Sequence, residues 1–271
     1  MILKNNIKKD SEHHPFHLVT VSPWPLFSSI FAFQFLIGFV SYLNNYISYL
    51  SFFLYFFFIS LIAAIWFNNI IWEATLCGYH TKKVQKGLKL GMVLFIASEI
   101  MLFFSFFWAF FHSSLAPSIW IGCIWPPIGI DIISYTHLPL LNTIILLSSG
   151  VSLTLSHRSL IYGKNLSYII YSLELTIFLG IYFTILQYIE YNNTFFTIND
   201  SIYGSVFYML TGFHGFHVLL GTFLLIVSLV RLYSYQFFNY QHIGYECAIW
   251  YWHFVDVVWI FLYILIYYWG C

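Results

Sequence analysis

Glu99 is an ionisable residue near the middle of a long apolar stretch, with Phe95, Phe103 and Phe104 around it. A charged carboxylate is costly in hydrocarbon, so such a residue usually faces protein or water. Two interpretations stay open. Glu99 is either a functional group, which handles protons or faces lipid and a partner, or a neutral carboxyl that forms a hydrogen bond with a neighbouring helix.

A second group of ionisable residues lies in the last apolar stretch. Glu246, His253 and Asp256 are spaced by seven and three residues, which puts all three on one face of a helix. His253 and Asp256 can form a hydrogen-bonded pair that costs less in the membrane than either charge alone. We therefore predict a buried polar network on this helix.

The histidines His214 and His217 stand one helical turn apart in an earlier apolar stretch. Imidazole binds iron, copper and zinc, so a metal or haem site is one interpretation. The other, which we favour, is that both histidines form hydrogen bonds between helices and belong to the buried polar network. We predict no metal ligands in the chain. The spacing disfavours a two-haem cytochrome and leaves a single haem open.

The composition of the chain indicates that these ionisable residues lie in a membrane protein. Only 7% of the 271 residues are charged, 61% are hydrophobic, and the mean hydropathy is +0.81. A soluble domain carries about 25% charged residues, so this chain has too few to cover a surface in water. The sequence predicts an integral membrane protein. It excludes a nucleic-acid binder, which needs a basic face, and a disordered chain.

A bilayer core of about 30 Å requires roughly 20 apolar residues in a helix. Seven stretches meet this requirement, and we expect an all-α polytopic membrane protein with helices at 24–43, 47–67, 88–111, 138–157, 167–190, 202–230 and 246–269. Glu174 and Glu190, toward the ends of the fifth stretch, are expected to reach the membrane interface.

The basic residues predict the orientation. All ten Lys and Arg precede the first span or follow the second, fourth or sixth, so they share the side of the N-terminus. Basic loops stay inside, which places the N-terminus inside and the C-terminus outside. The first residues, with Lys4, Lys8 and Lys9 followed by His and Glu, do not predict a signal peptide.

The chain is expected to have four parts. These are an inner polar tail at 1–23, a two-helix hairpin at 24–67, an inner connection at 68–87 and a five-helix bundle at 88–271.

Several long strings follow one another along nearly the whole chain beyond residue 13. They include His14-Pro-Phe-His17, Trp108-Ala-Phe-Phe-His112, Trp125-Pro-Pro127, Thr211-Gly-Phe-His-Gly-Phe-His217 and Trp250-Tyr-Trp-His-Phe-Val-Asp256. In these strings the sequence resembles subunit III of cytochrome c oxidase, in the haem-copper oxidase family.

The resemblance implies a non-redox core subunit. The complex passes electrons from cytochrome c to oxygen and pumps protons, with haem a and copper in subunits I and II and no cofactor or catalytic centre in subunit III. The implied fold is a two-plus-five arrangement with a V-shaped cleft for phospholipids. The implied roles are to stabilise the catalytic subunits and to support proton uptake. Subunits I and II, accessory subunits and membrane phospholipids are the implied partners.

Residues carried over from the resemblance are few. Glu99 matches the family's buried, carbodiimide-reactive glutamate. Glu73, His80 and Arg231 match lipid-binding positions near the headgroups in the cleft.

The connection after the second span departs from the family pattern. Asn68, Asn69 and Trp72 stand where many members have Arg-Asp and a second Arg. Each basic residue near an anionic surface contributes about 1 kcal/mol, so this lipid site should be weaker. Our hypothesis is that Lys82, Lys83 or a zwitterionic lipid compensates.

Two other functions stay open. One is a self-standing proton-coupled transporter that uses Glu99 and the 246–256 face. The other is subunit III of a quinol oxidase, which the hairpin argues against because those relatives commonly have five helices. The resemblance also implies a mitochondrial inner-membrane protein with its N-terminus in the matrix and its C-terminus in the intermembrane space. A bacterial plasma membrane is the alternative.

Overall fold

The computed structural model describes residues 14–270, and the chain over this range is all-α. Seven of its helices are long and apolar enough to cross a membrane, which confirms the seven predicted spans and defines a polytopic membrane protein. The helices are α1 (Trp24–Leu43), α2 (Tyr49–Thr75), α3 (Lys82–Leu115), α4 (Leu138–Ile161), α5 (Leu166–Asn192), α6 (Ser201–Tyr233) and α7 (Ile243–Leu262). Two short helices, η1 (Ile119–Ile121) and η2 (Tyr263–Tyr268), complete the set, and η2 continues α7. Part of the predicted tail 1–23, including Lys4, Lys8 and Lys9, lies outside the described residues.

The second and third helices are longer than the sequence predicted. Helix α2 ends at Thr75 rather than at residue 67, and α3 begins at Lys82 rather than at residue 88. The added turns carry polar residues, among them Glu73 and Lys86. Hydropathy predicts where the apolar, membrane-spanning part of a helix ends. Lys and Glu are good helix formers, so the helix can continue beyond that point.

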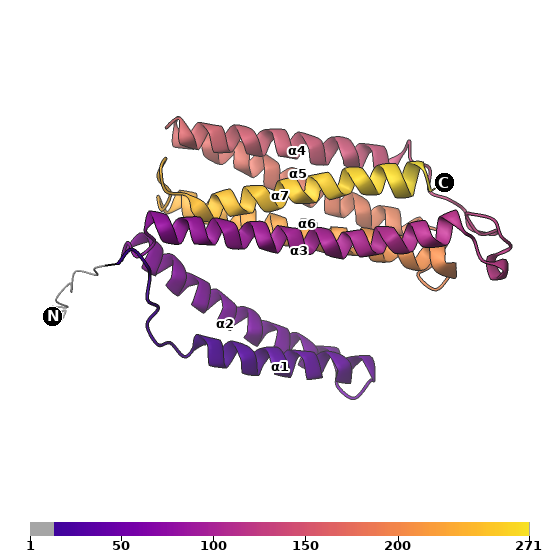
Figure 1. The fold of residues 1–271 in the computed structure, drawn as a ribbon, viewed down its shortest axis with the longest axis horizontal. Helices are drawn as coiled ribbons and strands as arrows, with labels where there is room; N and C mark the ends of the chain where they lie inside the picture. The colour runs from indigo at the N-terminus through magenta and orange to yellow at the C-terminus, as the bar shows by residue number, and fades with distance from the viewer. Residues whose placement is uncertain (1–13, 271) are drawn as a thin grey trace. The chain divides into compact units, whose positions relative to one another are not determined.

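The chain divides into two compact units with the boundary between Leu88 and Lys89. In the first unit, α1 and α2 form a hairpin (Figure 1). Asn45 in the turn has a positive φ of 59°, and the Ser48 hydroxyl accepts a hydrogen bond from the Ser51 amide at the start of α2. Phenylalanine rings join the two helices, with Phe31 stacked on Phe58. In this unit Gly38 is the buried residue of α1, and the helices otherwise present apolar side chains outward, as expected of a surface that meets lipid or other subunits.

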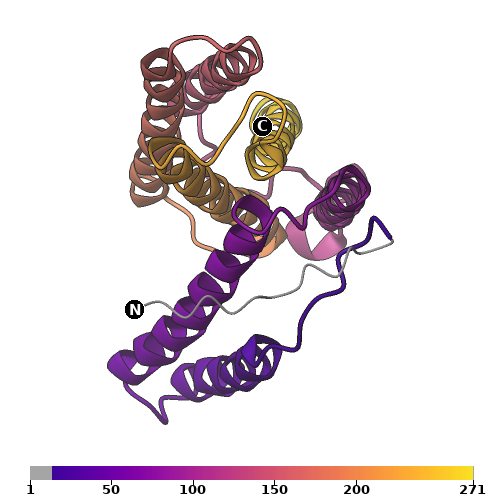
Figure 2. The same cartoon turned by 90° about the vertical axis from the view of Figure 1, so that its left-hand side faces the viewer.

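In the second unit, α4 to α7 run alongside one another and pack directly (Figures 1 and 2). Their core is built around Trp252, whose indole nitrogen donates to the Ser149 hydroxyl of α4 at 2.9 Å. Gly180 of α5 and Gly221 of α6 lie against the same indole ring. Small residues at such positions let membrane helices approach closely, and hydroxyl groups then join them by hydrogen bonds.

Helix α3 contacts the rest of the second unit through large aromatic side chains. Its Phe103 packs edge-on against His217 with ring centres 5.1 Å apart, and its Phe106 stacks on Phe213 at 5.2 Å. Phe95 stacks on Tyr251 of α7 at 6.1 Å. These rings bring the middle of α3, where Glu99 lies, to α6 and α7.

The close approach at Gly180 is open to a direct test. A β-carbon there would lie 2.5 Å from the Trp252 ring and 2.6 Å from the Thr222 methyl group. We expect Gly180→Ala to destabilise the protein by about 1–3 kcal/mol, because overpacking outweighs the better helix propensity of alanine. The measurement is the midpoint of thermal unfolding in detergent.

Gly212→Ala is the matched control, because a β-carbon at Gly212 meets no atom within 4 Å. We expect this variant to be as stable as the parent chain or more stable. Equal stability of the two variants would show that the contact at Gly180 does not limit packing.

Candidate functional site

Glu99 of α3 and His217 of α6 form a polar pair inside the second unit. The Glu99 Oε2 and His217 Nε2 atoms are 2.8 Å apart. The imidazole is almost fully buried, whereas 21% of the Glu99 side chain is exposed. The carboxyl therefore joins two helices and also reaches the surface of the unit.

The other ring nitrogen of His217 restricts where the proton of this pair can be. His217 Nδ1 lies 2.6 Å from the Phe213 carbonyl oxygen, which can only accept, so Nδ1 carries a hydrogen. A neutral His217 must then accept at Nε2 from a protonated Glu99. The alternative is a cationic His217 that donates to a Glu99 carboxylate. Both forms hold one proton between the two groups, and the pair has no net charge in either.

His214 lies one turn earlier on α6 and has a different partner. It is buried, and its Nε2 atom lies 3.2 Å from the backbone oxygen of Val255 on α7. Its ring packs against Phe183 and Trp259. The two histidines therefore bridge α6 to two different helices.

Of the three residues predicted to share one face of the last helix, two lie next to each other and the third has partners elsewhere. His253 Nδ1 and Asp256 Oδ2 are 3.6 Å apart, and Asp256 is buried against Gly150 of α4. Glu246, by contrast, forms an ion pair with Lys89 of α3 and lies 3.6 Å from His242 Nε2. The spacing predicted the His253–Asp256 pair but not the partner Lys89, because Lys89 comes from another helix.

Glu190 corrects one expectation. It is buried with 2% exposed surface, and its Oε1 atom accepts hydrogen bonds from Tyr267 at 2.6 Å and Gln187 at 3.1 Å. The prediction that Glu190 reaches the membrane interface was wrong, because a tyrosine from η2 covers it. Glu174 is exposed and accepts a hydrogen bond from Tyr233 at 2.6 Å.

The candidate lipid-binding residues of the first unit lie near a histidine cluster. Glu73 Oε2 is 3.9 Å from His17 Nε2. The His17 ring stacks on Tyr79 at 5.0 Å and lies 5.9 Å from the His80 ring. Gln85 donates to the His80 backbone oxygen at 2.9 Å. Glu73 and His80 are therefore both neighbours of His17.

Arg231, the lipid-binding candidate of the second unit, is held at the end of α6. Its guanidinium carbon lies 4.3 Å from the centre of the Phe237 ring, and its Nε donates to Gln236 at 3.1 Å. The stacking and the hydrogen bond fix the direction of the side chain and leave the charge half-buried.

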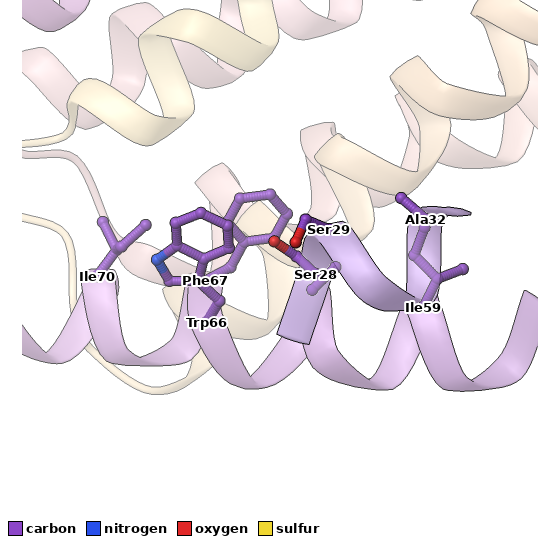
Figure 3. A pocket seen from close by; sticks show the side chains of 8 residues that line it. Ser28, Ser29, Ala32, Ile59, Trp66, Phe67 and Ile70 are labelled. Carbon is purple, nitrogen blue, oxygen red and sulfur yellow. The ribbon is translucent and has the colours of Figure 1, made fainter. Parts of the chain in front are cut away.

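Each unit also carries an apolar pocket. In the hairpin, a pocket of about 420 Å³ lies between α1 and α2 (Figure 3). It is lined by Ser28, Ser29, Ala32, Ile59, Ala63, Trp66, Phe67 and Ile70. In the second unit, a groove of about 650 Å³ between α3 and α7 is lined by aromatic and aliphatic side chains and by His253.

One group of side chains in the described range, 14–270, has the composition of a metal site. It consists of His157, His242 and Glu246, whose ligand atoms all lie within 4.8 Å of one another. No local motif predicts this group, because His157 is remote from the other two residues in the sequence. The only signal was the spacing of four residues between His242 and Glu246.

The helices and the polar pairs between them define a polytopic membrane protein. Comparison with known sequences gives the family. A model described as cytochrome c oxidase subunit III matches residues 14–271. Proteins named cytochrome c oxidase subunit 3 from Pisaster ochraceus and Chondrus crispus are 54% and 52% identical to the chain. The alignments cover 96% and 100% of this chain and 99% of each relative.

The chain belongs to the cytochrome c oxidase subunit III family. A third relative of the same name, from Podospora anserina, is 50% identical over 99% of this chain. Membership makes the chain a subunit of the oxidase complex, so other oxidase subunits are its partners.

Proposed function

We propose that the chain is a non-redox core subunit of cytochrome c oxidase that stabilises the catalytic subunits, holds phospholipids and supports proton uptake. The match to the family along residues 14–271 carries this proposal. The partners of the buried histidines support it, since His214 and His217 each hydrogen-bond to protein groups. Subunits I and II, which would carry haem a and copper, and accessory subunits are the proposed neighbours.

Purification through this chain in mild detergent tests the proposal. We expect haem a to co-purify and the preparation to consume oxygen with reduced cytochrome c. A preparation without haem in which the chain alone moves protons across liposomes would favour a self-standing transporter instead.

The proposed orientation has the N-terminus in the mitochondrial matrix and the C-terminus in the intermembrane space. Contacts within the second unit support this orientation, because they bring several basic residues to the same end of the helices. The ion pair of Lys89 with Glu246 brings the start of α3 to the start of α7. The contact of His157 with His242 brings the end of α4, which carries Arg158, to the same place. Basic residues gather on the inner side of membrane proteins.

The proposed role of Glu99 is to exchange protons at the surface of the second unit. It shares one proton with a buried histidine and is itself partly exposed. We expect Glu99→Gln to leave assembly unchanged, since an amide can still hydrogen-bond to His217, and to slow proton uptake by the complex. The measurement is the rate of proton uptake during turnover of the purified complex.

Glu174→Gln serves as the control, because Glu174 is an exposed carboxyl on α5. Uptake at the normal rate in Glu99→Gln would mean that Glu99 is only a neutral carboxyl joining α3 to α6.

We also propose phospholipid sites near Glu73 and His80 in the first unit and near Arg231 in the second. The family resemblance implies that they belong to a V-shaped cleft of a two-plus-five arrangement. The guanidinium of Arg231 suits a phosphate group, since its terminal nitrogens can donate two parallel hydrogen bonds. Lys82 and Lys83, exposed at the start of α3, are the proposed substitutes for the basic residues that the chain lacks.

Native mass spectrometry of the complex tests the lipid proposal. We expect replacement of both Lys82 and Lys83 by Gln to lower the retention of anionic lipid about 30-fold, because each basic residue contributes about 1 kcal/mol. Retention of a tightly held anionic lipid that is lost only in Arg231→Gln would contradict the compensation. Lys164→Gln is the control, because Lys164 follows α4 instead.

A further inference from the structure

His157, His242 and Glu246 converge at one end of the second unit. His157 lies in the last turns of α4, His242 directly precedes α7, and Glu246 is in the first turn of α7. The three ligand atoms lie within 4.8 Å of one another. The group therefore draws on two helices and the segment before the second, rather than on neighbouring residues of one helix.

Two of the three distances between the donor atoms fit a small tetrahedral ion, and the third lies within 4.8 Å. The Nε2 atoms of His157 and His242 are 3.3 Å apart, and His242 Nε2 is 3.6 Å from Glu246 Oε1. A zinc ion with bonds of about 2.0–2.1 Å and tetrahedral angles holds its donors about 3.3–3.4 Å apart. Two imidazoles and a carboxylate are also among the ligand sets that zinc takes, with the fourth position left to water.

A hydrogen bond to the backbone fixes the orientation of the His242 ring so that it can bind a metal ion. Its Nδ1 atom donates to the Phe238 backbone oxygen at 3.0 Å, so a neutral ring presents the lone pair of Nε2 to the group. Metal-bound histidines usually have such a second hydrogen bond, which fixes the ring and its tautomer. Phe238 is itself held by paired backbone hydrogen bonds with Gln241.

His157 can also bind a metal ion, and neither histidine ring has to lose a proton for this. Its Nε2 atom faces the Nε2 lone pair of His242, so in the absence of an ion His157 is the donor of that hydrogen bond. A shift of the His157 proton from Nε2 to Nδ1 frees its own lone pair for the ion. The His157 ring also packs edge-on against Tyr245, whose hydroxyl donates to Ser156.

In place of the prediction that the chain has no metal ligands, we propose that His157, His242 and Glu246 bind a zinc ion that joins α4 to the start of α7. The site is not closed off, since 19% of the Glu246 side chain is exposed. Lys89 is the natural competitor, because its ammonium group already pairs with Glu246 Oε2. An ion and the ammonium group would repel each other across the same carboxylate, so Lys89 weakens the site.

Zinc binding to the purified oxidase complex, titrated against a chromogenic chelator, tests the proposal. We expect His157→Gln and Glu246→Gln to bind one zinc ion fewer per complex, or to bind it about tenfold or more weakly, since even an outer-shell partner is typically worth 10–100-fold. We expect Lys89→Gln to bind zinc more tightly than the parent complex. His137→Gln is the matched control, since His137 is exposed at the other end of α4.

Zinc bound elsewhere in the complex is common to all these preparations and cancels in the comparison. Anomalous scattering at the zinc edge from the unsubstituted complex then locates the ion. A peak among the three side chains supports the proposal even where a variant fails to assemble. No peak there, or equal zinc affinity in His157→Gln, Lys89→Gln and the His137→Gln control, would overturn it.

Discussion

The hydrocarbon core offers no water, so each polar group inside it must find its partner within the protein. The second unit of this chain is arranged around that constraint. Glu99 joins α3 to α6 through His217, Trp252 joins α7 to α4 through Ser149, and His214 joins α6 to the backbone of α7. Apolar packing alone gives membrane helices little preference for one rotation over another, and these directional contacts supply it.

The first unit obeys the same constraint in a simpler way. Hydroxyl and amide groups on its helices form short-range hydrogen bonds to the backbone of their own helix. The two helices contact each other through aromatic rings such as Phe31 and Phe58. Most of its apolar side chains face outward. A surface of this kind suits contact with lipid and with apolar faces of other subunits. The difference between the units follows from sequence, because among residues 14–270 the buried carboxyls and the buried hydroxyls all belong to the second unit.

Hydropathy predicted all seven helices and both ends of α1, but not the end of α2 or the start of α3. The ends of α2 and α3 lie among polar residues, where a helix continues although the apolar run has stopped. Spacing placed His253 next to Asp256, and the two are 3.6 Å apart. Spacing along one helix could not reveal that Glu246 pairs with Lys89, since that contact depends on how α3 packs against α7.

The same limit applies to residues whose partners lie far away in the sequence. Glu190 resembled an interfacial carboxyl until Tyr267, 77 residues later in the chain, was seen to cover it. His157 and His242 are 85 residues apart and meet only in the folded unit. The local sequence pattern identifies which buried polar residues need a hydrogen-bond partner. The tertiary structure determines which residue that partner is.

We infer that the histidines of this chain hold helices together and that the redox centres of the complex lie in other subunits. Stripping the chain from the purified complex and recording redox difference spectra of both fractions tests it most directly. We predict that the haem a and copper signals remain with the other subunits. Haem that leaves with the chain would make His214, His217 or His253 a ligand and would contradict the account.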